Sequence, residues 1–550
     1  MEIRLKFMIS LASIVLIWSG CSKDKGNYTY STLDELQIST DMDEVDPTVF
    51  ITADSIEIQQ NDSLKVQLKV EKPSGKEKKL AYKWYLTQYE QSGLNPSIYV
   101  IDSTAVLRTK IRVTPNLYRL VAEVKDLATG VSYSKVFALN VATAEWGGEG
   151  WLVLQEATEG ADLSMITTRD GSNKGQVYHD LYSSTNGHQL PKGTFKVNVI
   201  DYATNLRAQK ISFLYPGGAL QVRSTDYADS SRSDSWFLGA PEHMNMQLNS
   251  SAGGSSAGFE YMVVDNRIAY RQFAGAASLA KPPLFFPPFE GLTVAPFVIN
   301  AASNDQYYTL FDLESKGFKV FNASNSVLSS IGKYAAAASN LDPEKGQGFD
   351  LTAIGDNLVY AENSQPINLT STIYWNCFFR DNQSSKTYVL QFPRSISYAN
   401  NFTTGRYQLL EANCPGINTA TLFANPTFLP MPGGVFYYVN GSKIYTCQLK
   451  PLASSSAKAD LSFPEGTIIK AMKIFKSGYT TANITALAVP EGKVLVVATD
   501  ETASGKGHKV YFFQLDAQTG AIKGSPANPA DVYEGFHKIS DISFKKALGR

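Results

Sequence analysis

The chain has 550 residues, of which 43% are apolar, so it is long enough to bury a sizeable core. Its 50 basic and 51 acidic residues nearly cancel, so no overall field would attract nucleic acid, and we expect no nucleic-acid partner. The 29 tyrosines and 29 phenylalanines favour strands over helices, and we expect an all-β protein.

Residues 1–20 predict a lipoprotein signal peptide. Arg4 and Lys6 precede an apolar run over residues 7–18 that is too short to span a bilayer well. Cys21 follows a serine and a glycine, and this pattern resembles a lipobox, in which the thiol is diacylated before cleavage. We therefore expect a lipid anchor at Cys21 to be the attachment to the membrane. The alternative is an ordinary signal peptide with an incidental cysteine.

Ser22, Lys23 and Asp24 resemble the short charged signal that sends lipoproteins of Bacteroidetes to the cell surface. We expect a lipid-anchored outer-membrane protein that is exposed at the surface, with simple solvation of a tether as the alternative reading of these three residues. Residues 21–48 are expected to be this tether, with a possible first strand. The acidic stretch 41–46 lacks the glycine and the distal glutamate of a calcium loop, so we expect no metal there.

Residues 49–145 predict a PKD/Ig-like β-sandwich. The segment 64–70 alternates strictly between apolar and polar residues, which is typical of a half-buried antiparallel strand. Trp84 stands where an immunoglobulin-like sandwich buries a tryptophan on its third strand. Tyr118 suits a tyrosine corner, and the strands that follow it predict the closing hairpin.

Residues 146–550 contain short strand patterns separated by turn residues, without a convincing amphipathic helix. A weak repeat relates residues 436–475 to residues 494–544. Each copy reads as strand, turn, strand, loop, glycine and a further apolar strand. A period of about 60 residues predicts a β-propeller-like domain of about seven blades, in which residues 539–544 complete the first blade beside 151–154. Stacked sandwiches are the structural alternative.

The search for catalytic chemistry gives no catalytic residue, no metal site and no cofactor. Residues 254–258 match the Gly-x-Ser-x-Gly pattern of a nucleophile elbow, but Ser256 lies in a low-complexity run typical of a flexible hairpin connection. The five histidines have no metal-binding spacing and are expected in loops or at the surface. Carboxylate pairs for glycoside hydrolysis are set by space rather than by sequence, so a hydrolase remains an alternative.

Three cysteines remain after Cys21, namely Cys377, Cys414 and Cys447. They allow at most one intramolecular disulfide, and their spacing fits no zinc motif. We expect them to be small buried apolar residues, and the sequence leaves their disulfide state open.

Aromatic residues gather in stretches that the sequence predicts as loops. Exposed rings would stack on sugars or anchor a partner. The alternative is that the rings have a structural role and pack between blades. These residues are Phe285, Phe286, Phe289, Trp375, Phe378 and Phe379.

The run 21–30 followed by 33–39 resembles the start of PKD-like family lipoproteins of Bacteroidetes. Strand segments that begin at Asp62, Tyr82 and Tyr118 are similar to the PKD-like module of that family. The similarity continues in motif detail to about residue 200, and beyond that in style only.

This resemblance implies an accessory lipoprotein of a SusC/SusD-type uptake system that captures glycan or peptide, or docks on the transporter. The family offers no established catalytic residues to carry over, and the ligand-binding residues stay unknown. We therefore expect a surface-exposed, non-catalytic binding component of nutrient uptake. The alternatives are a glycan- or peptide-degrading hydrolase or lyase on a propeller scaffold, and a structural or adhesive surface protein.

Overall fold

The computed structural model describes most of the chain after the N-terminal segment. The described ranges are 35–42, 49–75, 79–89, 98–113, 115–168, 175–202, 209–239, 241–253, 258–273, 282–300, 307–323, 325–330, 350–364, 374–393, 405–426, 434–450, 455–476 and 492–547. The chain divides into two compact units, the first ending at residue 141 and the second comprising 142–550 together with the short segments 59–61 and 112–115.

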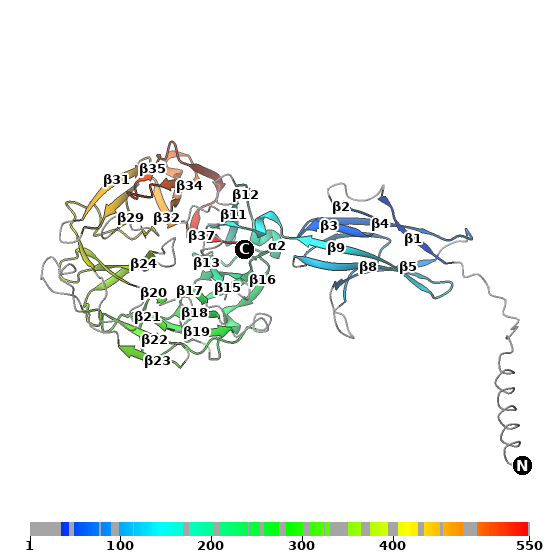
Figure 1. Cartoon of the computed structure of the whole chain (residues 1–550), viewed down its shortest axis with the longest axis horizontal. Coiled ribbons are helices and arrows are strands. Elements are labelled where there is room, and N and C mark those ends of the chain that lie inside the picture. Colours follow the sequence, from blue (N-terminus) through cyan, green and yellow to red (C-terminus); the bar gives the residue numbers. More distant parts are fainter. Residues whose placement is uncertain are drawn as a thin grey trace, which may run out of the picture. The chain divides into compact units, whose positions relative to one another are not determined.

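The first unit is a β-sandwich of two antiparallel sheets, with strand orders β1-β4-β7 and β2-β3-β9-β8-β5-β6 (Figure 1). Its strands are β1 (Gln37–Thr40), β2 (Phe50–Ile51), β3 (Ser55–Gln59), β4 (Ser63–Glu71), β5 (Leu80–Gln88), β6 (Tyr99–Asp102), β7 (Val106–Lys110), β8 (Asn116–Asp126) and β9 (Ser132–Ala142). The predicted closing hairpin is confirmed as β8 paired with β9. β1, which pairs with β4, lies within the expected tether.

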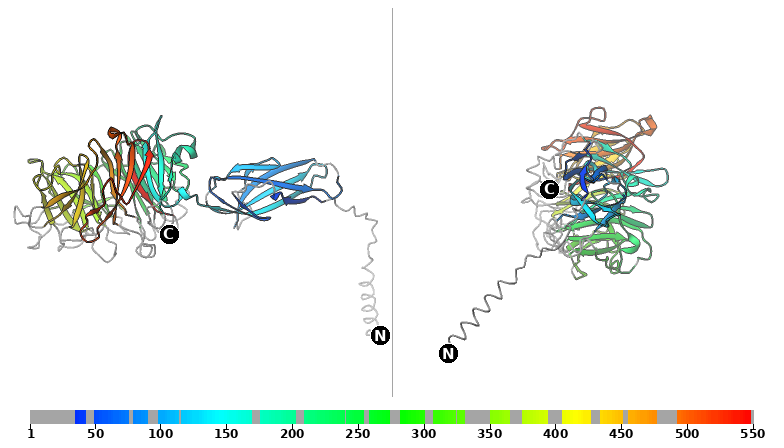
Figure 2. Two further views of the ribbon diagram at one scale, coloured as in Figure 1. Left: turned by 90° about the horizontal axis from the view of Figure 1, so that it is seen from above. Right: turned by 90° about the vertical axis from the view of Figure 1, so that its right-hand side faces the viewer.

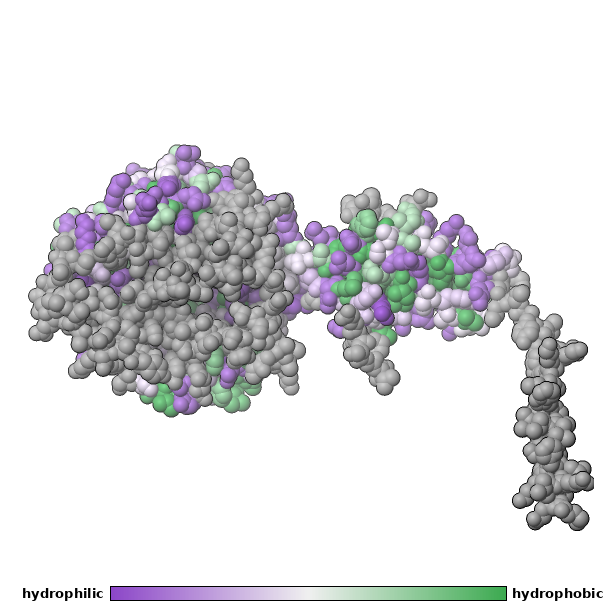
Figure 3. All heavy atoms as spheres, in the orientation of Figure 1, coloured by the Kyte–Doolittle hydropathy of each residue, from purple (hydrophilic) through white to green (hydrophobic). Residues whose placement is uncertain are grey.

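The core of the sandwich follows from the alternation in the sequence. Leu64, Val66 and Leu68 of β4 are buried, whereas the residues between them are more exposed. Trp84 is completely buried, as predicted, and its Nε1–H donates a hydrogen bond to the carbonyl oxygen of Thr104 (2.9 Å). Over the face of this unit visible in Figure 3, hydrophobic and hydrophilic residues are interspersed.

The described residues of the second unit form seven small antiparallel sheets, which lie around a common centre in Figure 1. The left view of Figure 2 shows this body from the side, with the strands running through its thickness. The sheets have the orders β12-β11-β10-β37, β13-β14-β15-β16, β17-β18-β19, β20-β21-β22-β23, β24-β25-β26-β27, β28-β29-β30-β31 and β32-β33-β34-β35, with β36 also paired to β34.

The strands of these seven sheets have two to eight residues each. They are β10 (Gly150–Glu156), β11 (Ala161–Thr167), β12 (Val177–Tyr178), β13 (Lys196–Asp201), β14 (Gln209–Tyr215), β15 (Gly218–Arg223), β16 (Asp229–Arg232), β17 (Met246–Gly253), β18 (Gly258–Val264), β19 (Arg267–Phe273), β20 (Val294–Asn300), β21 (Tyr307–Asp312), β22 (Gly317–Asn322), β23 (Val327–Ser330), β24 (Asn357–Ser364), β25 (Tyr374–Arg380), β26 (Thr387–Pro393), β27 (Gly405–Leu409), β28 (Phe423–Ala424), β29 (Val435–Asn440), β30 (Lys443–Gln448), β31 (Ser456–Ser462), β32 (Ile468–Ile474), β33 (Val494–Asp500), β34 (His508–Leu515), β35 (Ile522–Lys523), β36 (Asp531–Phe536) and β37 (Ile539–Lys545).

The C-terminal strand completes the sheet with which the second unit begins. β37 pairs with β10, so that Phe544 lies opposite Trp151 and Ile542 lies opposite Val153. This confirms the predicted pairing of residues 539–544 beside 151–154. The ring of Trp151 also contacts Phe512 of the seventh sheet, with the ring centroids 6.2 Å apart, so the closing strand and its neighbour share one core.

Several neighbouring sheets contact one another through their first strands, and in the first sheet β37 takes this position. β37 contacts both β13 and β32, and further contacts join β13 to β17, β17 to β20, β20 to β24 and β28 to β32. The sequence repeat is offset from the sheets by one strand. Residues 436–475 contain β29, β30 and β31 of the sixth sheet and then β32, which opens the seventh sheet. Residues 494–544 end in the same way with β37.

The sequence predicted two aromatic stretches as loops, and the prediction is wrong for one of them: residues 285–289 lie outside the strands, whereas residues 375–379 lie in β25. Trp375, Phe378 and Phe379 belong to β25 and are buried, and Phe285 is buried as well. Both faces of these sheets are covered by neighbouring sheets, so consecutive aromatic residues can all be buried. The alternative of packing between sheets is therefore confirmed for these four, while Phe286 keeps half of its surface exposed.

The low-complexity run before Gly258 was also misread in part. Its first half, up to Gly253, belongs to β17, where Asn249 is buried and donates to Oε1 of Glu260 (3.0 Å). Composition alone does not reveal this partner on the next strand.

The described ranges contain the short α-helix α2 (Leu181–Asn186), and Gly187, with φ of 75°, caps its C-terminus. None of the helices in the described part of the chain is long and apolar enough to cross a membrane.

Candidate functional site

The residues that the sequence selects for lipid attachment and export do not fall within the described residues. Cys21, Ser22, Lys23 and Asp24 precede the first described residue, and Ser256 also lies outside the described ranges. Of the five histidines, His243 lines a pocket in the second unit. Within the described residues, we take this pocket as the candidate ligand site.

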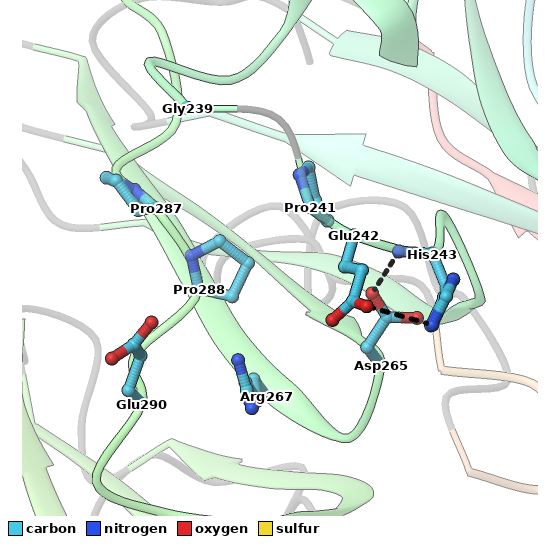
Figure 4. A pocket seen from close by; sticks show the side chains of 9 residues that line it. All are labelled: Gly239, Pro241, Glu242, His243, Asp265, Arg267, Pro287, Pro288 and Glu290. Carbon is cyan, nitrogen blue, oxygen red and sulfur yellow. Dashed lines mark hydrogen bonds and ion pairs between the residues drawn. The ribbon is translucent and has the colours of Figure 1, made fainter.

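The pocket has a volume of about 480 Å³, within the usual range for small-ligand sites (Figure 4). We call it the β18–β19 pocket because Asp265, in the turn between these strands, and Arg267, at the start of β19, belong to its lining. It is lined by Gly239, Pro241, Glu242, His243, Asp265, Arg267, Pro287, Pro288 and Glu290.

The hairpin of β18 and β19 positions the central residues of the pocket. Asp265 and Asn266 form its two-residue turn, and both have positive φ, 51° and 57°. This is the pattern of a type I′ turn, which Asp and Asn tolerate well and which matches the twist of paired strands. The Asp265 carboxylate accepts hydrogen bonds from the backbone N–H groups of His243 and Asn245, both at 3.1 Å. The turn and the neighbouring segment are thereby fixed to each other.

Pro287 and Pro288 form a second wall. They belong to an extended segment along the outer edge of β19, where the backbone N–H groups of Phe286 and Phe289 donate to carbonyls of β19 at 3.0 and 2.8 Å. The two prolines between these donors have no N–H group, and their rings fix φ. The wall is therefore rigid, apolar and unable to continue a regular ladder.

Charges of both signs surround the opening. The side chains of Glu242 and His243 are 88% and 77% exposed, with Oε1 and Nε2 3.6 Å apart. In Figure 4, Glu290 lies across the pocket from them and Arg267 lies between. Within the described part of the chain, the side chains of Arg267 and Glu290 have no hydrogen-bond or ion-pair partner. Both can therefore bind a ligand without first losing an internal partner.

A second polar cluster is buried between the second and third sheets. Glu260 forms an ion pair with Arg271 at 2.6 Å, and its carboxylate also accepts hydrogen bonds from Gln221, Asn249 and the Tyr202 hydroxyl. Burial, reinforced by the Glu260 charge, raises the pKa of Tyr202 well above its usual value. Because both oxygens of Glu260 are occupied, this cluster holds two sheets together and the carboxylate is not free to bind a ligand.

Other features of the described residues make weaker sites. In the described ranges no group of three or more His, Cys, Asp or Glu side chains could hold a metal ion. A second pocket, of about 400 Å³, lies on β4 and β7 of the sandwich and includes Lys65, Arg108 and Lys110. Arg108 and Lys110 lie on the edge strand β7, where basic side chains commonly prevent edge-to-edge pairing, which accounts for these two without a ligand.

The sequence analysis left the ligand-binding residues unknown. Two signals point to parts of the pocket: Asp265-Asn266 between two apolar runs is a hairpin turn, and the double proline at 287–288 is typical of an edge segment. The meeting of residues 239–243, 265–267 and 287–290 depends on the folded sheet, and no spacing in the sequence encodes it.

Solved structures similar to the chain include a quinonprotein alcohol dehydrogenase-like protein from Bacteroides thetaiotaomicron. It is 11% identical, with 92% of this chain and 99% of that chain covered and a TM-score of 0.46. The BBS1N protein in complex with ARL6DN is also 11% identical, with 74% and 93% covered and a TM-score of 0.26. At these TM-scores neither similarity supports a conclusion about this chain.

No curated protein matches the chain. Residues 21–193 match the model of the PKD-like family, a range that contains the sandwich and the strands β10, β11 and β12. The match confirms the resemblance that the sequence showed in its N-terminal part. Residues 21–193 are therefore a PKD-like family region, in a chain that is all-β in its described residues apart from short helices.

Proposed function

We propose that this protein is a non-catalytic binding protein of the bacterial surface and an accessory component of a SusC/SusD-type nutrient uptake system. Its ligand is a glycan or a peptide that enters the β18–β19 pocket. The observation that carries the proposal is the pocket itself, because its Arg267 and Glu290 side chains are exposed and unpaired among the described residues. Binding sites built on rigid elements hold their ligand groups in fixed positions.

The proposed scaffold is a closed propeller of seven blades. The pairing of β37 with β10 supports closure, because it joins the two ends of the second unit within one sheet. The succession of contacts between first strands supports the ring. In such a scaffold the blade edges are protected, and the connecting loops are free to vary and to bind.

The composition of the pocket favours a peptide over a neutral glycan. Its nine lining residues include three carboxylates, one arginine and one histidine, but no aromatic ring on which a sugar could stack. Three prolines provide apolar walls for a short side chain or for another proline. Charges of both signs suit the backbone and side chains of a peptide with a basic residue.

The proposed location rests on the N-terminal sequence. Cys21 would carry the acyl chains, and Ser22, Lys23 and Asp24 would direct surface export. Membrane attachment would then be through lipid, and the transporter and its accessory lipoproteins would be the partners. No cofactor is part of the proposal.

A hydrolase is the second candidate, and one observation favours it. Glu290 and Glu242 lie on opposite sides of the pocket in Figure 4, and glycoside hydrolases use two carboxylates on opposite sides of the scissile bond. Incubation of the ligand with the wild-type chain and with Glu290→Gln distinguishes the two. Loss of turnover in the variant would establish the hydrolase.

Two measurements on the native protein test the proposal. Mass spectrometry of the mature N-terminal peptide is expected to show an acylated Cys21, and co-purification from detergent-solubilised outer membrane is expected to recover a SusC/SusD-type transporter. A chain found without lipid in the cytosol would overturn the proposed location. A lipidated chain that recovers no transporter would overturn the proposed partner.

A further inference from the structure

Two buried cysteines of the second unit lie in contact. The Sγ atoms of Cys414 and Cys447 are 3.7 Å apart, and neither side chain has exposed surface. Cys377 is buried in a different apolar cluster. The structure therefore selects one pair among the three combinations that the sequence left open.

The backbone on both sides brings these two sulfur atoms together. Cys447 lies on β30, directly opposite Ala457 of β31. The N–H group of Ala457 donates to the carbonyl oxygen of Asn413, the residue before Cys414 (2.9 Å). The N–H group of Cys414 in turn donates to the carbonyl oxygen of Leu410 (2.8 Å). The backbone that carries the two cysteines is thus held by hydrogen bonds, which keeps both side chains in the same part of the sixth sheet.

The two cysteines lie beside a weakly paired part of the sixth sheet. β28, which opens the sixth sheet, has two residues and pairs with β29 over two positions only. The connection that precedes it joins both sheets: Asn418 accepts from the N–H group of Thr387 in the fifth sheet (2.8 Å), and the Tyr438 hydroxyl of the sixth sheet donates to the carbonyl oxygen of Pro415 (3.0 Å). Cys414 lies within this connection.

We propose that Cys414 and Cys447 form a disulfide bond in the exported protein, which ties the connection between the fifth and sixth sheets to β30. The Sγ atoms have to approach from 3.7 Å to about 2.05 Å, which side-chain rotation accomplishes. The bond rests on the proposed export, because structural disulfides persist in oxidising compartments. Cys377 remains a free thiol.

The bond forms by thiol–disulfide exchange with an oxidised protein disulfide of the cell envelope. Because both thiols are buried, the oxidant reaches them only when this part of the sheet opens locally. The hydrogen bond with Cys447 lowers the pKa of Cys414, whereas burial raises the pKa of Cys447, so Cys414 is the first nucleophile. Its thiolate attacks one sulfur of the oxidant and expels the other as a thiolate. Cys447 then loses its proton and attacks the Cys414 sulfur, which releases the second thiol. Two electrons and two protons pass from the pair to the oxidant, which becomes a dithiol.

The test uses the full chain isolated from the cell envelope without reductant. The protein is denatured in N-ethylmaleimide, digested and mapped by mass spectrometry. The expected result is a cross-linked peptide containing Cys414 and Cys447, with Cys377 alkylated. Because both thiols are buried in the folded protein, the second sample is purified protein that has been unfolded and refolded in a mixture of oxidised and reduced glutathione, and its cross-link is expected at the same pair.

The two samples separate the failure of the pairing from the failure of export. A cross-link that forms with oxidised glutathione but is absent from the envelope sample supports the pairing and counts against the oxidising location. Three alkylated cysteines in both samples, or a cross-link that includes Cys377, would overturn the proposal.

Variants give an independent readout. Reductant is expected to lower the Tm of the wild-type chain by roughly 3–6 °C, because the cross-link restrains the unfolded state. The same shift is expected in the matched control Cys377→Ser, and it should be lost in Cys414→Ser and in Cys447→Ser. If the latter two do not fold, the response of the wild type and of Cys377→Ser to reductant still decides. A reductant effect of equal size in Cys414→Ser would contradict the bond.

Discussion

Lys545, the last residue of β37, donates hydrogen bonds from Nζ to the carbonyl oxygens of Gly147 and Gly148, and the distance to the Gly147 oxygen is 2.5 Å. Lys545 and Gly147 are 398 residues apart in the chain. The side chain is completely buried, and this burial lowers the pKa of Lys545 to about 7, against partial opposition from Asp201 and Glu149. The contact joins the closing strand to the segment that leads into β10.

This contact makes stability depend on pH. The unfolded lysine keeps its proton up to about pH 10.5, whereas the folded one loses it near pH 7, so folding releases a proton between these values and stability rises with pH. We expect the free energy of unfolding to increase by about 2 kcal/mol from pH 7 to pH 9 through this residue. Guanidinium unfolding at pH 7, 8 and 9 measures the increase.

The increase should disappear in Lys545→Met and persist in Lys538→Met, a matched control whose exposed lysine pairs with Glu156 on the surface. Equal pH dependence in Lys545→Met and the wild type would show that another group is responsible.

The buried ion pair between the second and third sheets predicts a large effect of one substitution. Arg271→Met leaves the Glu260 carboxylate buried without its cation, which is expected to cost about 3–5 kcal/mol in urea unfolding. The double variant Glu260→Gln/Arg271→Met should be less destabilised, since no charge is left unpaired. Lys458→Met, which removes an exposed cation, is the control and should change stability little. An Arg271→Met variant as stable as this control would refute the role of the pair.

The closing strand predicts a link between the two ends of the second unit. Ile542→Ala should destabilise the chain by about 3 kcal/mol, because Ile542 is buried against the core that contains Trp151. In a chain that ends at Lys538, the β10 amides on the side of β37 should lose their protection from hydrogen exchange, while those on the side of β11 serve as an internal reference. Ser540→Ala, a change at a half-buried position of the same strand, serves as the control. Continued protection of β10 in the shortened chain would contradict closure by β37.

The sequence predicted the parts of the fold that local patterns specify. Alternation over residues 64–70 gave β4 and its buried face, and the apolar run 539–544 gave a closing strand with the correct partner. It failed where burial is set by neighbouring sheets. Trp375 and Phe378 were placed in loops because nothing near them in sequence shows that both faces of β25 are covered.

The candidate site could not be predicted from the sequence, for a related reason. Arg267, Glu242 and Glu290 come from three separate segments, and each is an ordinary surface residue in its own segment. The I′ turn at Asp265 and Asn266 and the double proline at 287–288 had a local signal, but neither indicates a ligand. The lipid anchor at Cys21 is the opposite case, because its evidence is local sequence and the residue lies outside the described ranges.

Titration calorimetry of the purified full chain against a panel of soluble peptides and glycans tests the proposed binding function most directly. The account predicts that at least one ligand class, with peptides containing a basic residue foremost, binds and is recovered intact. Its affinity should fall about tenfold or more in Arg267→Ala and in Glu290→Ala, and stay unchanged in the control Lys458→Ala. A panel without any binder, or binding of equal strength in both pocket variants, would contradict the account.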